Sequence, residues 1–188
     1  MDKYIEIIKQ RLNPYRFNHS VCVAKCAEKL AEIYNADVQK AYVAGILHDI
    51  MKNTPDKEQL DYLKKHNVVL TETELSNPKL YHAISGAHYV KNDLKIEDVE
   101  IIDAIRFHTT GRAKMSLLEK VIYVADFISD DRDYNGIDEI RQAAYRSLEE
   151  AMMIGLEFSI QEITQKKQTL HPDSVDAYNE LILEGNYE

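Results

Sequence analysis

The sequence is poor in the residues and patterns that mark several large protein classes. Only 6 of its 188 residues are glycine and 4 are proline, whereas 45% are hydrophobic and 29% are charged. This composition excludes collagen-like chains and disordered linkers, which need far more glycine or proline or far fewer apolar residues. The longest apolar run, Ala41–Leu47, is much shorter than the roughly 20 residues of a membrane-spanning helix.

An excess of basic residues is missing as well. The chain has 23 basic and 32 acidic residues, which gives a net charge of −9. Proteins that bind nucleic acid usually carry a basic excess, because neutralising phosphates supplies their affinity. We therefore expect neither a nucleic acid nor a membrane as partner. A small phosphorylated substrate remains compatible with this charge, because a few local cations and a metal ion can outweigh the global balance.

The marks of secretion are also lacking. The two cysteines, Cys22 and Cys26, form no C-x-x-C motif and no second pair that would build a disulfide framework. We interpret them as buried thiols in a reducing compartment. Residues 1–6 carry charges where a signal peptide would have its apolar stretch. Together these features predict a cytoplasmic protein.

What the sequence does contain is helical periodicity. Apolar residues recur at helical spacing and predict helices over residues 2–12, 17–34, 37–47, 137–167 and 174–183. Further helix starts and turns are indicated by Thr54-Pro55, Asn77-Pro78, His171-Pro172, the capping boxes Thr71–Glu74 and Ser116–Glu119, and the turn Asn135-Gly136. No stretch shows a convincing period of two. We expect residues 1–188 to form one all-α domain of about eight to ten helices.

Polar residues interrupt this apolar pattern at three places. Asp126 is flanked within residues 121–128 only by apolar and aromatic residues. Burying a bare carboxylate there costs on the order of several kcal/mol, so it needs either a core cation or a metal ion. The pair His48-Asp49 ends an apolar helix and is either a metal-binding pair or a core histidine with a capping aspartate. His19, near the start of its helix, would by itself be structural.

These positions gain meaning as a set. They supply two imidazoles and two carboxylates from three apolar helices, namely His19, His48, Asp49 and Asp126. A mixed nitrogen–oxygen ligand shell suits Fe, Mn, Co or Zn better than Ca or a structural Zn. Four such ligands leave positions open for water and substrate, as a catalytic metal site requires.

The order H…HD…D resembles the HD-domain metal-dependent phosphohydrolases. Six further blocks look like the YqeK family, and the resemblance extends from about Tyr15 to Asn179. They are HDIMK at 48–52, AIRFHTTGR at 104–112, MSLLEK at 115–120, YVAD at 123–126, RD at 132–133 and LHPD at 170–173. Met51 departs from the pattern, because a smaller residue is expected before Lys52.

The resemblance implies a single HD-domain helical bundle that hydrolyses diadenosine tetraphosphate at its centre and gives two ADP. It also implies a bound transition metal, iron above all, with Mn, Co or Zn as alternatives. Another nucleotide phosphohydrolase or nucleotidase on the same scaffold, or a catalytically weak nucleotide-sensing module, is the alternative function. The partner is then a dinucleoside polyphosphate or a nucleoside diphosphate. Whether the chain is a monomer or a homodimer stays open.

Three cationic side chains are candidates for phosphate contacts in this interpretation. Lys52 lies one helical turn past His48 and can direct a charge at the phosphate chain as a catalytic residue. Arg16, three residues before His19, shares its helical face. Arg132 can form a bidentate phosphate contact. Its alternative is a salt bridge to Asp130 or Asp133.

His82 and His108 form a further candidate pair. Some HD enzymes use two additional histidines for a second metal ion. Here the two could do that, bind phosphate directly or act as a general acid. Thr109, together with Thr110 and Gly111, could offer hydroxyl and backbone donors to phosphate.

His171, Pro172 and Asp173 start the last helix, where free N–H groups favour an anion. In the YqeK family this segment lines the nucleotide site, and its alternative role is a simple helix cap. His66 and His88 are expected to lie outside the site.

Overall fold

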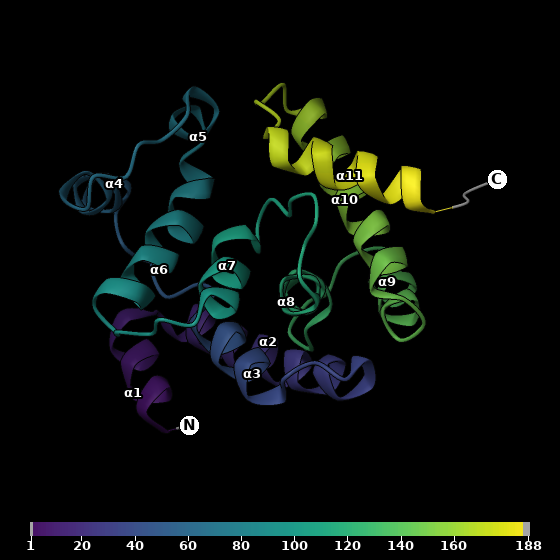
Figure 1. Ribbon diagram of the computed structural model, residues 1–188, viewed down its shortest axis with the longest axis horizontal. Helices are drawn as coiled ribbons and strands as arrows, with labels where there is room; N and C mark the ends of the chain where they lie inside the picture. The colour runs from purple at the N-terminus through teal and green to yellow at the C-terminus, as the bar shows by residue number, and fades with distance from the viewer. Residues whose placement is uncertain (1, 186–188) are drawn as a thin grey trace.

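The computed structural model describes residues 2–185, so the remainder of the expected 1–188 domain lies outside the described residues. These residues form eleven α-helices and one 3₁₀ helix, with no strand among them, which confirms the all-α class with one helix more than the expected range (Figure 1). The helices are α1 Asp2–Arg11, α2 Pro14–Tyr34, α3 Val38–Leu47, α4 Asp56–Lys65, α5 Glu72–Ser76, η1 Pro78–Leu80, α6 Tyr81–Asn92, α7 Val99–Phe107, α8 Leu117–Ile128, α9 Ile137–Ala144, α10 Leu148–Gln165 and α11 Pro172–Glu184.

Most helix starts follow the local sequence. Thr71 and Ser116 form complete capping boxes at α5 and α8. Asn77 caps η1, and Gly136 adopts a left-handed φ of 91° before α9, as the turn signal predicted. Pro55 precedes α4 instead of opening it, so the predicted cap at Thr54 is wrong by one residue.

The single helix predicted over residues 137–167 is also wrong. The structure divides it into α9, which ends at Ala144, and α10, which begins at Leu148. Ser147 is extended, with φ of −153°, and its side chain accepts a hydrogen bond from the backbone N–H of Glu150. This cap satisfies an N–H group that would otherwise be unpaired at the start of α10, and it stabilises the break.

Helix α8 lies at the centre of the bundle. It packs against α2, α3, α7, α9 and α10, and Figure 1 shows it almost end-on between α7 and α9. Eight of its twelve residues are buried. A helix that is apolar on nearly every side is stable only in such a central position. Asp126, near the C-terminal end of this helix, is therefore carried toward the interior.

Helices α2 and α3 approach each other unusually closely. A Cβ atom on Gly45 would lie 2.8 Å from Cα of Ala24, which is closer than side chains tolerate. The absence of a side chain at Gly45 thus permits the contact. It brings the buried His19 of α2 beside the buried His48 at the end of α3.

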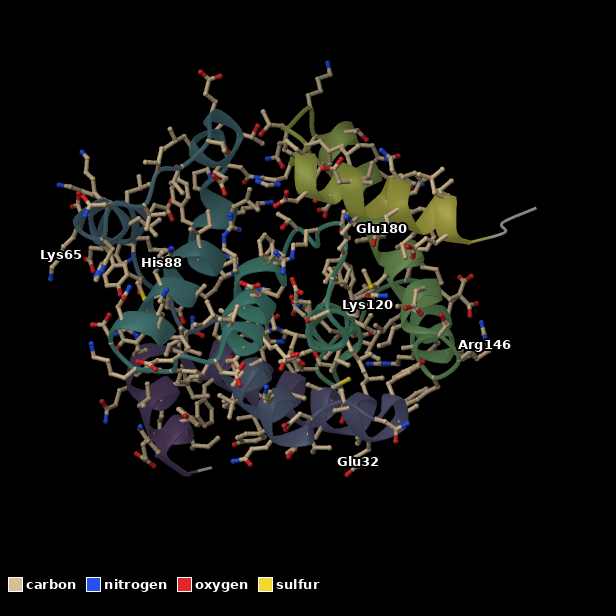
Figure 2. The ribbon with its side chains drawn as sticks, viewed as in Figure 1. Glu32, Lys65, His88, Lys120, Arg146 and Glu180 are labelled. Carbon is tan, nitrogen blue, oxygen red and sulfur yellow. The ribbon has the colours of Figure 1, made fainter. Side chains whose placement is uncertain are left out.

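The outer surfaces of the helices carry most of the charge. Figure 2 shows Lys65 and Arg146 projecting outward from the bundle, and both are exposed. Within residues 2–185, no helix is both long and apolar enough to cross a membrane.

A candidate metal centre

Three residues converge inside the bundle: His19 of α2, His48 at the end of α3 and Asp126 of α8. Nε2 of His19 lies 2.9 Å from Oδ1 of Asp126, and Nε2 of His48 lies 3.9 Å from the same oxygen. One ligand atom from each residue falls within 4.8 Å of the others. Ligands of a transition metal surround it at roughly 2.0–2.2 Å. The three atoms are therefore near enough to share one ion.

His48 supplies the clearest sign that these residues fit a metal. Its Nδ1 donates to the carbonyl oxygen of Gly45 at 2.7 Å, so its Nε2 is the lone-pair nitrogen. The side chain is fully buried, and its Nε2 is one of two buried side-chain polar atoms without a hydrogen-bond partner in the described chain. An unpaired buried acceptor is costly, and a metal ion would satisfy it.

A second group adjoins the first. Oδ1 of Asp49 lies 3.2 Å from Nε2 of His82 and 3.8 Å from Nε2 of His108. The two histidine Nε2 atoms are 3.2 Å apart. His108 donates from Nδ1 to the carbonyl oxygen of Ile105 at 2.7 Å, as His48 does to Gly45, and turns its other nitrogen into the site. Ligand atoms of His48, Asp49 and His108 also lie within 4.8 Å of one another.

Three partly buried cations surround the carboxylates. Arg16 contacts Oδ2 of Asp49 at 3.1 Å, and Lys52 donates to Nε2 of His82 at 3.0 Å. Arg132 contacts Oδ1 of Asp126 at 2.5 Å. The salt bridge that offered the alternative explanation for Asp126 thus exists beside the histidines.

Arg132 also donates from Nε to the backbone carbonyl of Asp126 at 2.8 Å. Its guanidinium contacts Asp126 and His19, whereas the alternative partners, Asp130 and Asp133, form no salt bridge with it within the described residues. Met51, where the resemblance leads us to expect a smaller residue, is buried, and its sulfur accepts a hydrogen bond from Arg11 at 3.0 Å.

Burial sets the protonation of the histidines. It lowers the pKa of both His82 and His108 to about 4, and it also lowers the pKa of His48. These imidazoles are therefore neutral at pH 7, which is the form that binds metal. His19 differs, because the hydrogen bond and charge of Asp126 outweigh burial and raise its pKa.

The carboxylates are ionised. Burial alone would raise the pKa of Asp49, but the neighbouring His48, His82 and Lys52 hold it well below its usual range. For Asp126, His19, His48 and Arg132 likewise overcome burial and lower the pKa. The site thus combines anionic oxygens with neutral nitrogens, a donor set that suits a divalent transition metal.

One participant, Asp131, was missed by the sequence analysis. Its Oδ2 lies 2.8 Å from Nδ1 of His19, and its Oδ1 accepts a hydrogen bond from the hydroxyl of Ser129 at 2.7 Å. A carboxylate that holds the far nitrogen of a histidine is the usual support of a metal ligand. The only sequence signal was an acidic residue just beyond the end of the Asp126 helix.

The other predicted substrate residues lie around an adjoining hollow. Thr109 places its hydroxyl 3.1 Å from Nε2 of His108, and it lines a cavity of about 150 Å³ together with Thr110 and His171. His171 caps α11 by accepting a hydrogen bond from the backbone N–H of Asp173 at 3.2 Å. Pro172 is the first residue of α11, and of residues 171–173 His171 alone lines this cavity.

This cavity is the middle of three neighbouring hollows. Lys79 lines both it and a hollow of about 210 Å³ that includes Lys52 and His82. Glu162 lines both it and a hollow of about 240 Å³ that includes Asp126 and Arg132. Because they share lining residues, we call these three neighbouring hollows together the groove, and its two outer hollows include His82 and Asp126 of the histidine and aspartate cluster.

Comparisons with known proteins agree with this geometry. The HD domain family model matches residues 16–130. The symmetrical bis(5'-nucleosyl)-tetraphosphatase of Halalkalibacterium halodurans is 38% identical over 97% of this chain and 97% of its own length. The protein of the same name from Bacillus subtilis is 37% identical over 96% of this chain and 97% of its own length.

A solved structure shares the whole fold. The crystal structure of a "predicted HD superfamily hydrolase involved in NAD metabolism" from Clostridium acetobutylicum is 36% identical. It superposes with a TM-score of 0.95 over 98% of this chain and 97% of that one.

Proposed function

The chain belongs to the HD-domain family and, within it, to the group of symmetrical bis(5'-nucleosyl)-tetraphosphatases, and from this premise we propose that it is a metal-dependent hydrolase that cleaves diadenosine tetraphosphate into two ADP. The observation that carries the proposal is the unpaired Nε2 of His48, which is buried and faces Asp126 and His19. A helical bundle with a purely structural role would not need an unpaired, buried nitrogen at this position.

In this proposal His19, His48, Asp49 and Asp126 hold a metal ion, iron by resemblance, with Mn, Co or Zn compatible with the same donors. When bound, such an ion supplies Lewis-acid chemistry, since it lowers the pKa of a water and polarises a phosphoryl oxygen. Oδ2 of Asp49 lies 3.7 Å from Nε2 of His48, and its Oδ1 lies near His82 and His108, so with these two histidines Asp49 could also hold a second ion.

The lowered pKa values favour one role for His82 and His108. An imidazole with a pKa of about 4 carries almost no proton at pH 7, so neither residue is suited to be the general acid. Among the roles predicted from the sequence, we propose metal or phosphate contact for both. ADP is a good leaving group and does not need strong protonation.

The cations have a direct role in the reaction. Arg16 and Lys52 pair with Asp49 and Arg132 pairs with Asp126, and each of the three cations is about one quarter exposed. A tetraphosphate carries several negative charges, and these three side chains are positioned to bind it. The oxygen of water forms a bond to one central phosphorus, the bridging P–O bond breaks, and the electron pair leaves on the terminal phosphate of ADP.

We also propose that the chain works as one cytoplasmic domain. One buried apolar core extends from Ile8 in α1 to Leu181 in α11, and it includes most of the buried apolar residues of the described chain.

The decisive experiment is to incubate the metal-loaded protein with diadenosine tetraphosphate and to separate the products by anion exchange. We expect ADP as the sole product. AMP plus ATP would show asymmetric cleavage and contradict the proposal. Binding without turnover would favour the nucleotide-sensing alternative.

Metal removal provides the matched arm of this experiment. We expect dialysis against a chelator to abolish hydrolysis and one of Fe, Mn, Co or Zn to restore it. Ca²⁺ is the control, because its preference for oxygen ligands fits a site with the two histidines His19 and His48 poorly. Full activity after chelation would contradict the metal-dependent mechanism.

A further inference from the structure

An aromatic hollow lies at one end of the groove, beside the candidate metal centre. It has a volume of about 240 Å³ and is lined by Asp126, Phe127, Arg132, Tyr134, Phe158 and Glu162. Two of these residues, Asp126 and Arg132, also belong to the histidine and aspartate cluster. A ligand in the hollow would therefore lie next to the site of the reaction.

The rings of the hollow are arranged as a platform. Tyr134 and Phe158 are stacked, with ring centroids 5.7 Å apart and an interplanar angle of 25°. The hydroxyl of Tyr134 donates to the carbonyl oxygen of Phe127 at 2.9 Å, which holds its ring in place. Phe158 is 46% exposed although it is a large apolar side chain. Core packing does not explain why an aromatic ring stands at this position.

We infer that this hollow binds the nucleobase of one ADP half of the substrate, stacked on the ring of Phe158. The inference rests on the proposed function and adds the position of a nucleoside to it. Pockets for whole drug-sized ligands measure roughly 300–1,000 Å³, so a hollow of about 240 Å³ suits a single ring system.

The charges around the hollow separate the base from the phosphates. The carboxylates of Asp126 and Glu162 line it and repel phosphate. The guanidinium of Arg132 stands between the hollow and the metal centre, where it can contact the phosphate attached to the bound nucleoside. An uncharged aromatic base is thus the part of a nucleotide that fits between Glu162 and the two rings.

Stacking can be tested with a fluorescent reporter. The chain contains no tryptophan, so Phe158→Trp introduces a single indole into the hollow. We expect ADP, added to this variant with the activating metal, to quench the indole fluorescence in a saturable way. Inorganic pyrophosphate, which has the phosphates and no base, should bind without quenching.

A matched control is available in Tyr145→Trp. Tyr145 is also an exposed aromatic residue, at 55%, and it lies at the end of α9 outside the three hollows of the groove. Its indole should not respond to ADP. Equal quenching in both variants, or equal quenching by ADP and pyrophosphate at Phe158→Trp, would overturn the inference.

A second variant covers the case in which an indole does not fit. Phe158→Leu keeps an apolar side chain and removes the ring on which a base would stack. We expect the ADP dissociation constant, measured by calorimetry, to rise about fivefold or more, with no change for pyrophosphate. An unchanged ADP affinity would refute the stacking role.

The two proposals fail in different ways. If the parent protein does not cleave diadenosine tetraphosphate, the proposed function is wrong whatever the fluorescence shows. If it does cleave this substrate, and ADP binds to Phe158→Trp without quenching, the function stands and the position of the base is wrong.

Discussion

Asp131 and His19 are joined by a contact of 2.8 Å between a carboxylate oxygen and Nδ1, while Nε2 of the same ring faces Asp126 at 2.9 Å. An imidazole between two carboxylates is stable without a metal only when both nitrogens carry protons, and the pKa of His19 is accordingly raised. A metal ion would take the place of the proton on Nε2, and Asp131 would keep the proton on Nδ1.

This arrangement predicts that Asp131→Ala weakens metal binding while the ligands themselves remain. Loss of a carboxylate that supports a metal-bound histidine typically costs about 10–100-fold in affinity. The measurement is competition with a chelator of known affinity. Asp130→Ala is the matched control, because Asp130 is the exposed neighbour. Equal affinities in the two variants would show that Asp131 does not act through His19.

Asp49→Ala should abolish hydrolysis of diadenosine tetraphosphate and leave the helical fold largely intact. Asp49 belongs to the second ligand group and lies 3.7 Å from His48, which the two groups share, whereas its ion-pair partner Arg16 is 25% exposed and can turn its charge to water. Turnover is measured by product separation and helicity by circular dichroism. Asp138→Ala, at an 85% exposed carboxylate, should behave like the parent protein. Near-parental turnover of Asp49→Ala would refute the mechanism.

The parts of the site that could be predicted from the sequence are the polar residues that interrupt an apolar helical pattern. Asp126 stands out because a carboxylate interrupts an apolar helix, and the structure does bury that helix at the centre of the bundle. His48 and Asp49 stand out at the end of an apolar run for the same reason. His19 became a candidate only because it forms a set with the other proposed ligands and because of the family resemblance.

The parts that were missed depend on tertiary contacts. Asp131 lies in a loop 112 residues from His19, and no local pattern distinguishes it from its exposed neighbour Asp130. Tyr134 and Phe158 would be taken for ordinary core aromatics by their spacing. The break before Leu148 depends on the N-cap at Ser147. The residues around Ser147 are all compatible with a helix, so the sequence alone does not mark this break.

The buried histidines predict an acid-sensitive stability in the metal-free protein. His82 and His108 have pKa values of about 4 in the folded chain, against about 6.5 for an unfolded histidine. Between these values the unfolded state binds more protons, so the free energy of unfolding falls as the pH drops from about 6.5 to about 4. His48, whose pKa is also lowered, acts in the same direction, whereas the raised pKa of His19 stabilises the folded chain as the pH falls toward about 6.5, above this window.

Urea unfolding in the presence of a chelator, at several pH values across this window, measures the effect. His108→Gln removes one of the titrating groups and should flatten the dependence. His66→Gln is the control, because the ring of His66 packs against Tyr62, at a centroid distance of 4.5 Å, and His66 is not among the cluster residues. A dependence of the same steepness in all three proteins would contradict the assignment.

The close contact between α2 and α3 predicts that Gly45→Ala is destabilising. The new Cβ would meet Cα of Ala24 at 2.8 Å, and because that atom is backbone the two helices must move apart. Overpacking of this kind costs about 1–3 kcal/mol. The carbonyl oxygen of Gly45 accepts the hydrogen bond of His48, so the shift should also weaken metal binding.

Gly86→Ala separates this effect from helix propensity. A Cβ on Gly86 has its nearest neighbours at 3.7 Å, which is an ordinary contact, and alanine favours a helix over glycine by roughly 1 kcal/mol. We expect Gly86→Ala to match or exceed the parent stability in urea unfolding and Gly45→Ala to fall below it. If both variants unfolded at the same urea concentration and bound metal equally well, the space between α2 and α3 would not be what places His48 beside His19.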